Sequence, residues 1–357
     1  MENGKPDFNR VSAALQHREA DRVPLMEAAI AYEIQSQFLG RPVTEDDLAA
    51  RVEFWWRAGY DYIPLTVGLM APGAVTRESQ ISQVISRVML QGAAEADDES
   101  WNLEKHAWIH DEGDFEAFPW QEAARVDLSE LHRVQPHLPE GMKIIALSGK
   151  IFTLAWMLMG FQNLAVNSLL NPRFVEKVLE QVARIQLAAL AQIVAIPNVA
   201  AVWAVDDLAF NSGPLVRPWT LREYVFPWYR QVARQCHEHG LYFLFHSDGR
   251  LWELLADLIE LGIDALHPID PTCMDINEVK SKVGDRLCLI GNIPTELLQN
   301  GAPAEVAELS RRRLRELAPG GGYALGSGNS VPHWARLENY QAMRETALRD
   351  GRYPIAL

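Results

Sequence analysis

The chain has 357 residues, and its 33 lysines and arginines against 47 aspartates and glutamates give a net charge of −14. This acidic balance argues against nucleic acid as a partner, because phosphates are bound by basic surfaces. The three cysteines, Cys236, Cys273 and Cys288, lack zinc or redox spacing, which favours a reduced, cytoplasmic protein. No apolar run is long enough for a membrane span, so no membrane association is expected.

Short apolar runs alternate with amphipathic helices along the chain, an order typical of parallel strands joined by helices. The expected strands are residues 23–26, 62–66, 143–147, 199–205, 241–245, 263–266, 287–290 and 323–325. Eight such strands predict an α/β fold, a (β/α)8 TIM barrel formed by residues 1–357 as one domain. An open doubly wound sheet is the alternative, but no glycine-rich phosphate fingerprint follows the first strand.

Residues 70–140 interrupt this alternation and are expected to form an insertion or cap, with a hairpin strand at 86–91. The clearest helix begins at Asn171-Pro172, because proline is favoured in the first turn. Another begins near Pro218 and is interrupted at Pro227. A helix at 305–317 is followed by three glycines, which we interpret as a helix stop and not as a phosphate loop.

Polar side chains follow seven of the eight expected strands. In barrels of this class the chemistry lies at the carboxyl ends of the strands, so these residues are expected to share one mouth. They are Glu27, Ser148, Asp206, Asp207, His246, Asp248, His267, Asp270, Asn292, Ser327 and Asn329.

The sharpest local motif is His246-Ser247-Asp248-Gly249, directly after the most apolar strand. Histidine titrates near neutral pH and is a common metal ligand. Asp248 is then a second ligand, a proton partner or a group that orients the imidazole. The alternative is that Asp248 caps a helix beginning at Arg250.

Two further acidic positions are candidates. The pair Asp206-Asp207 suggests general acid–base work, since shared burial separates two carboxyl pKa values. Neighbouring side chains leave a strand on opposite faces, so at most one of the two is expected to point inward. Glu27 is either a metal ligand or base, or a surface acid in a loop.

Several short stretches, in order, carry a family resemblance: 10–15, 21–24, 115–120, 246–249, 291–293 and 319–323. Together they resemble the uroporphyrinogen decarboxylase superfamily over residues 10–354. The resemblance implies a (β/α)8 barrel that forms a homodimer. It also implies one of two chemistries: decarboxylation of uroporphyrinogen, or methyl transfer to or from a corrinoid protein or coenzyme M.

Three departures speak against decarboxylation. The decarboxylases place arginines after the first strand, where this chain has residues 27–32 without arginine. They carry a tyrosine where this chain has Trp156, and a histidine where it has Ser327.

The methyltransferase branch holds zinc with a His-x-Cys pair and a later cysteine. Here His246 matches, while Asp248 and Ser327 replace the two cysteines. The resemblance therefore implies a harder site of His246, Asp248 and Glu27 or Asp206. Such a site either binds zinc as a Lewis acid on an ether oxygen or protonates the leaving oxygen without a metal.

The sequence thus predicts a methyltransferase that demethylates a small, aromatic methyl ether and passes the methyl group to a corrinoid (cobalamin) protein. His246, Asp248, Asp206 and Asp207 would be catalytic. The substrate would be bound by Glu27, Ser148, Trp156, Phe210, Asn292 and Ser327. Two alternatives stay open: a decarboxylase of a tetrapyrrole or smaller acid, and a corrinoid- or tetrapyrrole-binding protein without catalysis.

Overall fold

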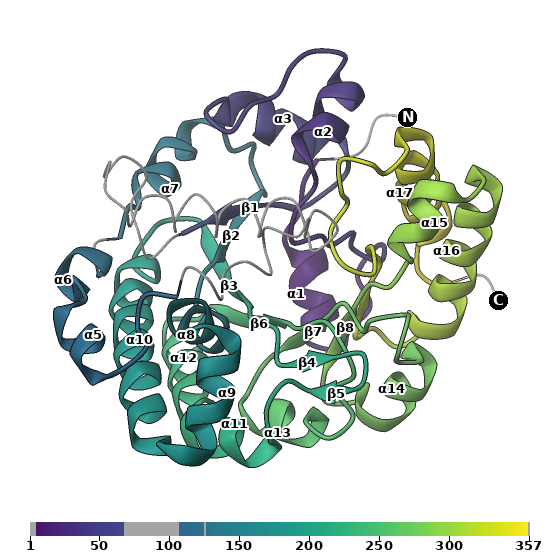
Figure 1. The fold of residues 1–357 in the computed structure, drawn as a ribbon. Coiled ribbons are helices and arrows are strands. Elements are labelled where there is room, and N and C mark those ends of the chain that lie inside the picture. The colour runs from purple at the N-terminus through teal and green to yellow at the C-terminus, as the bar shows by residue number, and fades with distance from the viewer. Residues whose placement is uncertain (1–4, 68–106, 125, 356–357) are drawn as a thin grey trace.

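The fold is built on a curled sheet of parallel strands, seen in a computed structural model that describes residues 5–67, 107–124 and 126–355 (Figure 1). The strand order is β1-β2-β3-β6-β7-β8-β9, and each neighbouring pair is parallel. The strands are β1 Tyr62–Thr66, β2 Lys143–Leu147, β3 Val199–Val205, β6 Tyr242–His246, β7 Ala265–His267, β8 Cys288–Ile290 and β9 Tyr323–Ala324. The predicted α/β barrel is confirmed in its general form.

The expected first strand, residues 23–26, is reduced to a single bridge. Leu25 pairs with Leu325 in a parallel sense, beyond the end of β9. The Met26 amide donates to the Leu325 carbonyl at 2.9 Å, and the Leu325 amide donates to the Pro24 carbonyl at 3.0 Å. Pro24 has no amide hydrogen to offer to a ladder, so the segment occupies the eighth position without forming a full strand.

The strands at 62–66, 143–147 and 199–205 lie where the sequence predicts them, and the later four differ by one or two residues. Hydrophobic side chains from both faces of the strands are buried, including Trp203, Phe243, Phe245 and Tyr323. Strands covered on both faces read as continuous apolar runs, which is why sequence periodicity located them.

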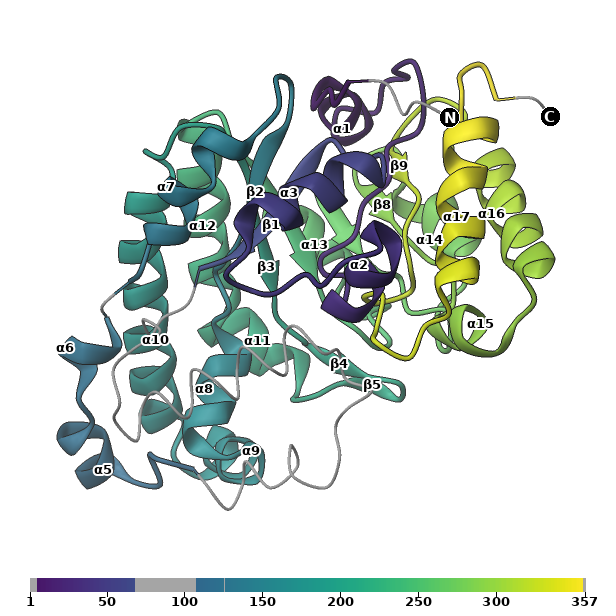
Figure 2. The same ribbon diagram turned by 90° about the horizontal axis from the view of Figure 1, so that it is seen from above.

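Helices surround the sheet, with α16 and α17 packed together on one side and α10 and α12 on the other in both views (Figures 1 and 2). The helices are α1 Asn9–Leu15, α2 Tyr32–Leu39, α3 Leu48–Arg57, α5 Glu112–Ala117, α6 Trp120–Ala123, α7 Ser129–Arg133, α8 Phe152–Met159, α9 Phe161–Leu170, α10 Pro172–Ile193, α11 Pro218–Tyr224, α12 Phe226–Glu238, α13 Leu255–Glu260, α14 Ile276–Val283, α15 Thr295–Asn300, α16 Pro303–Leu317 and α17 Leu337–Asp350, with a 3-10 turn η3 at Gln135–His137.

The helix boundaries follow the proline and glycine signals. α10 begins at Pro172, and the chain breaks at Val225 between α11 and α12, two residues before Pro227. After α16, Gly320, Gly321 and Gly322 have φ angles of 82°, 81° and 67°, a left-handed path that favours glycine. The three glycines therefore end the helix, as predicted.

The described residues include only part of the expected insertion at 70–140. Its hairpin strand at 86–91 lies outside the described residues, and the described part of the segment carries α5, α6, α7 and η3. The three cysteines are free. Among the described residues, no helix combines the length and apolar character that a membrane span requires.

Candidate active site at the carboxyl ends of the strands

Three side chains from two neighbouring strands meet at the mouth of the barrel. His246 is the last residue of β6 and pairs in register with Val205, the last residue of β3. The loops after these strands bring Asp207 and Asp248 to the imidazole. The His246 Nε2 atom lies 3.6 Å from Asp207 Oδ1 and 3.8 Å from Asp248 Oδ1. Together they form a group of ligand atoms compact enough to hold one metal ion.

Asp248 presents one carboxylate oxygen without a partner. Its Oδ2 accepts a hydrogen bond from Asn329 Nδ2 at 2.6 Å, while Oδ1 is buried and has no hydrogen-bond partner. Burial raises the pKa of this carboxyl well above its usual range, and the charges of Asp207 and Asp270 raise it further. An oxygen in this condition is ready for a proton or a metal ion.

The helix-cap interpretation of Asp248 is wrong. The next helix, α13, begins only at Leu255, five residues beyond Arg250. Asp248 instead receives Asn329 from the far end of the chain and donates its own amide to Asp207 Oδ1 at 2.9 Å. Asp248 therefore belongs to the group of side chains at the carboxyl ends of the strands and does not cap a helix.

A second histidine supports the first from within the barrel. His267, the last residue of β7, pairs in register with His246, and their Nδ1 atoms are 2.7 Å apart. Burial lowers the pKa of both imidazoles. In a hydrogen bond between two neutral rings, one Nδ1 atom carries the hydrogen and the other accepts it, so the tautomers of His246 and His267 are linked.

Asp206 does not join this group. Its carboxylate accepts the backbone amides of Ile151, Phe152 and Thr153 at 2.9, 2.7 and 2.6 Å, and the hydroxyl of Tyr229. Burial raises its pKa, and these hydrogen bonds oppose the shift. Of the adjacent pair only Asp207 reaches His246, as strand alternation predicts. The catalytic assignment of Asp206 is therefore replaced by a structural one at the start of α8.

Glu27 also lies outside the metal-ligand group. It is fully buried, and both its oxygens are occupied: Oε1 accepts the Ser327 amide and Oε2 the Ser327 hydroxyl, each at 2.6 Å. Burial raises the pKa of Glu27 to about 8, opposed by the two Ser327 hydrogen bonds. The prediction of Glu27 as a metal ligand is not supported, because Glu27 is not among the ligand atoms that gather around His246 in the described residues. Glu27 is a buried acid whose hydrogen bonds with Ser327 link the segment after residues 23–26 to the segment after β9.

The remaining candidates are dispersed. Asn292 is buried and donates to the Ile269 carbonyl at 2.7 Å, leaving its Oδ1 without a partner. Ser148 is buried directly after β2. Trp156 lies on α8 with its Nε1 buried and unpartnered. Phe210, on the two-residue strand β4 Ala209–Phe210, is half exposed and does not line the cavity described next.

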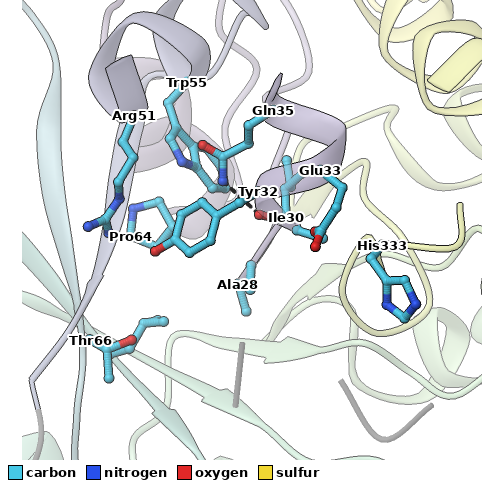
Figure 3. A pocket seen from close by; sticks show the side chains of 13 residues that line it. Ala28, Ile30, Tyr32, Glu33, Gln35, Arg51, Trp55, Pro64, Thr66 and His333 are labelled. Atoms are coloured by element: carbon cyan, nitrogen blue, oxygen red, sulfur yellow. Dashed lines mark hydrogen bonds between the residues drawn. The ribbon is translucent and has the colours of Figure 1, made fainter. Parts of the chain in front are cut away.

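A cavity of about 170 Å³ opens beside the ends of β1 and β2 (Figure 3). Its wall includes the last residues of these strands, Thr66 and Leu147, together with the segment that follows the bridged residue Leu25. The lining is Ala28, Ala29, Ile30, Ala31, Tyr32, Glu33, Gln35, Arg51, Trp55, Pro64, Thr66, Leu147 and His333. Because the first strand segment supplies small apolar side chains here, the cavity is largely apolar.

Lys150 is a mouth residue that sequence reasoning missed. It lies two residues after Ser148 and is only 8% exposed. Burial lowers its pKa, opposed by the charges of Asp207 and Asp206, and its own charge in turn lowers the pKa of His246. Lys150 follows Ser148 by two residues, as Asp248 follows His246. This shared spacing is the sequence signal that could have identified Lys150.

The fold and site define a parallel α/β barrel with a histidine–carboxylate centre at the carboxyl ends of its strands. The family model of uroporphyrinogen decarboxylase (URO-D) matches residues 119–349. The chain therefore belongs to the uroporphyrinogen decarboxylase family. Among solved structures it is similar to a methyltransferase from Methanosarcina mazei, with a TM-score of 0.64 and 16% identity over 95% of this chain and 97% of that one. At this identity the likeness establishes the shared fold. No curated protein sequence matches the chain.

Proposed function

We propose that the chain is a methyltransferase that demethylates a small aromatic methyl ether and passes the methyl group to a corrinoid protein. The observation that carries the proposal is the group of His246, Asp207 and Asp248, in which one buried carboxylate oxygen has no partner. A methyl ether is cleaved only when its departing oxygen is protonated or bound to a Lewis acid. His246, Asp207 and Asp248 could supply a proton donor for the first route or metal ligands for the second.

Without a metal, Asp248 is the acid. Burial raises its pKa, which favours the protonated carboxyl, and Asn329 holds the other oxygen so that the acidic proton lies on the free side. The proton passes to the ether oxygen as the bond between that oxygen and the methyl carbon breaks. Asp207, which is more exposed, then stabilises the positive charge that His246 gains if it takes up a proton.

The donor set also fits a metal ion, because imidazole nitrogen and carboxylate oxygen are ligands of zinc. His246 Nε2, Asp207 and Asp248 would hold it, and His267 would fix the His246 tautomer through Nδ1. When bound, zinc supplies Lewis-acid polarisation of an ether oxygen.

The cavity beside β1 and β2 suits a single ring better than a tetrapyrrole. Its volume is about 170 Å³, and cavities of about 150 Å³ are known to take up benzene. Arg51 lines this cavity, but its guanidinium already donates hydrogen bonds to the Glu130 carboxylate and to the Glu45 carbonyl. A substrate with many carboxylates would therefore meet alanines and the acid Glu33 in this cavity. The methyltransferase among the structural neighbours is in keeping with this chemistry.

The test is a methyl-transfer assay with purified protein, a reduced corrinoid protein and a panel of aromatic methyl ethers. The expected result is formation of methyl-cobalt, followed by its absorbance, together with release of the free phenol. An Asp207→Asn variant should lose most of this activity, since it weakens both routes. Conversion of uroporphyrinogen to coproporphyrinogen without methyl transfer would establish the decarboxylase alternative, and corrinoid binding without any turnover would establish the non-catalytic one.

A further inference from the structure

Four arginines gather around a second cavity, which lies between α16, α17 and the chain that follows α17. Its volume is about 470 Å³. Arg311 and Arg315 reach it from the second half of α16, Arg349 from the end of α17, and Arg352 from just beyond that helix. The two helices lie side by side in both views (Figures 1 and 2). We call this hollow the arginine cavity.

The arginine cavity lies at the opposite end of the barrel from the histidine–carboxylate group. Helices of a (β/α)8 barrel run back against the direction of the strands, so their last residues lie near the amino ends of the strands. The chain after α17 confirms this position, because Arg352 pairs with Arg22, the residue before the expected first strand at 23–26. A ligand in this cavity would therefore be separate from the one at the mouth.

Two of the four arginines are paired with acids. Arg311 Nε donates to Asp350 Oδ2 at 3.1 Å, and Arg349 donates to both oxygens of Asp350 at 2.7 and 2.8 Å. Arg311 also donates to Glu308. The hydrogen bonds from Arg349 hold the pKa of Asp350 below its usual range, so this carboxylate is charged at neutral pH. Asp350 and Glu308 thus offset the charges of Arg311 and Arg349.

Arg315 and Arg352 are not offset. Within the part of the chain that the structure describes, their guanidinium groups form no hydrogen bond or ion pair. The carboxyl ends of α16 and α17 contribute about half a negative charge each, which is less than the two positive charges. A positive balance therefore remains in this cavity, although the whole chain carries a net charge of −14. Gathered like charges of this kind attract an anion.

The shape and chemistry of the cavity favour an organic phosphate. A guanidinium donates two parallel hydrogen bonds to phosphate oxygens. One phosphate group carries about 1.5 to 2 negative charges near neutral pH, enough to neutralise two arginines, whereas a single carboxylate neutralises one. Leu314, Pro354 and Ile355 form an apolar part of the wall. Since a cavity of about 150 Å³ already holds benzene, the larger volume here leaves room for an organic group beside the phosphate.

We propose that the arginine cavity binds the phosphate group of a small, soluble phosphorylated molecule, with Arg315 and Arg352 as the residues that hold it. Arg311 and Arg349, fixed by Asp350, form the adjoining wall. The site is separate from the mouth of the barrel, and the inference does not depend on the proposed function.

The experiment measures binding of glucose 6-phosphate and of glucose, its uncharged counterpart, by calorimetry on the full chain at one ionic strength. Wild type should bind the phosphate about 10- to 100-fold more tightly, the usual value of charge-assisted hydrogen bonds. Arg315→Met and Arg352→Met should each weaken this binding about 3- to 10-fold, because both side chains are exposed and screened by salt. The double variant should lose the preference. The control Arg312→Met removes an exposed arginine of the same helix that lies outside the cavity, and it should leave the preference unchanged.

The inference is overturned if wild type binds both sugars equally, if the double variant keeps the preference, or if Arg312→Met weakens binding as much as Arg315→Met. Glucuronate, which carries one carboxylate on the same sugar, should bind less tightly than the phosphate, and equal affinity would contradict a phosphate site. Binding to phosphatidylglycerol vesicles without binding of glucose 6-phosphate would identify a lipid headgroup and overturn the soluble ligand. The substituted arginines are exposed, so thermal melting should not change; if the double variant fails to fold, the two single variants carry the comparison.

Discussion

Replacing Asp248 by asparagine is the most informative perturbation of the proposed mechanism. Asn329 Nδ2 donates to Asp248 Oδ2 at 2.6 Å, and an asparagine carbonyl at 248 can accept the same bond. The backbone amide that donates to Asp207 is unaffected. The loop is therefore expected to keep its conformation, while the acid, the charge and the unpartnered oxygen are lost together.

The expected loss follows from the role of the group. A missing proton donor typically costs about a hundredfold to ten-thousandfold in rate, or about 3 to 5 kcal/mol in activation free energy. The turnover number for methyl transfer from an aromatic ether should fall by this amount, with little change in melting temperature. In a metal-free protein the wild-type rate should also decline as pH rises through the raised pKa of Asp248, because only the protonated carboxyl donates.

Asp270→Asn is the matched control. Asp270 is a neighbouring acid whose charge raises the pKa of Asp248, but its oxygens accept from Thr272 and Gly249 and not from the centre. The Asp270→Asn substitution should change the rate by less than about tenfold, because Asp270 influences the Asp248 carboxyl through its negative charge. An Asp248→Asn protein that turns over within about threefold of wild type would refute the assignment, because nothing else in the group replaces the acid.

Four further outcomes are expected. His267→Phe should lower the turnover number about 10- to 100-fold without unfolding the protein, since the His246 tautomer is no longer fixed; an unchanged rate would remove His267 from the site. The folded pKa of Glu27, about 8, lies above its ordinary value of 4.5, so its protonated form stabilises the fold at low pH. Wild type should lose about 1.4 kcal/mol of unfolding free energy per pH unit between those values, a slope that Glu27→Gln should abolish in denaturant titrations. Asp206→Asn should destabilise the fold by about 1 to 3 kcal/mol in the same titrations, because one amide oxygen cannot replace the four hydrogen bonds; an unaltered stability would contradict its structural role. Sedimentation at micromolar concentration should give a dimer mass, as the family resemblance implies, and a monomer would contradict it.

The sequence alone determined the barrel and the place of its mouth. Strands such as β3 and β6 are buried on both faces and therefore appear as apolar runs, and helix boundaries follow Pro172 and the glycines after α16. The positions just after these strands gave His246 and Asp248. The prediction of the first strand, residues 23–26, went too far. Pro24 has no amide hydrogen, and only a single bridge forms where a strand was expected.

Only the tertiary structure decided what each polar residue does. Asp206 and Asp207 are adjacent in sequence, yet one fixes the start of α8 and the other reaches His246, because side-chain direction depends on the path of the loop. The 2.7 Å contact of His246 with His267 depends on the register of β6 and β7. Whether Lys150 has a partner depends on every segment packed around it. Strand periodicity is a local property that burial imposes on the sequence, whereas hydrogen-bond partners and charge environments arise from residues far apart in the chain.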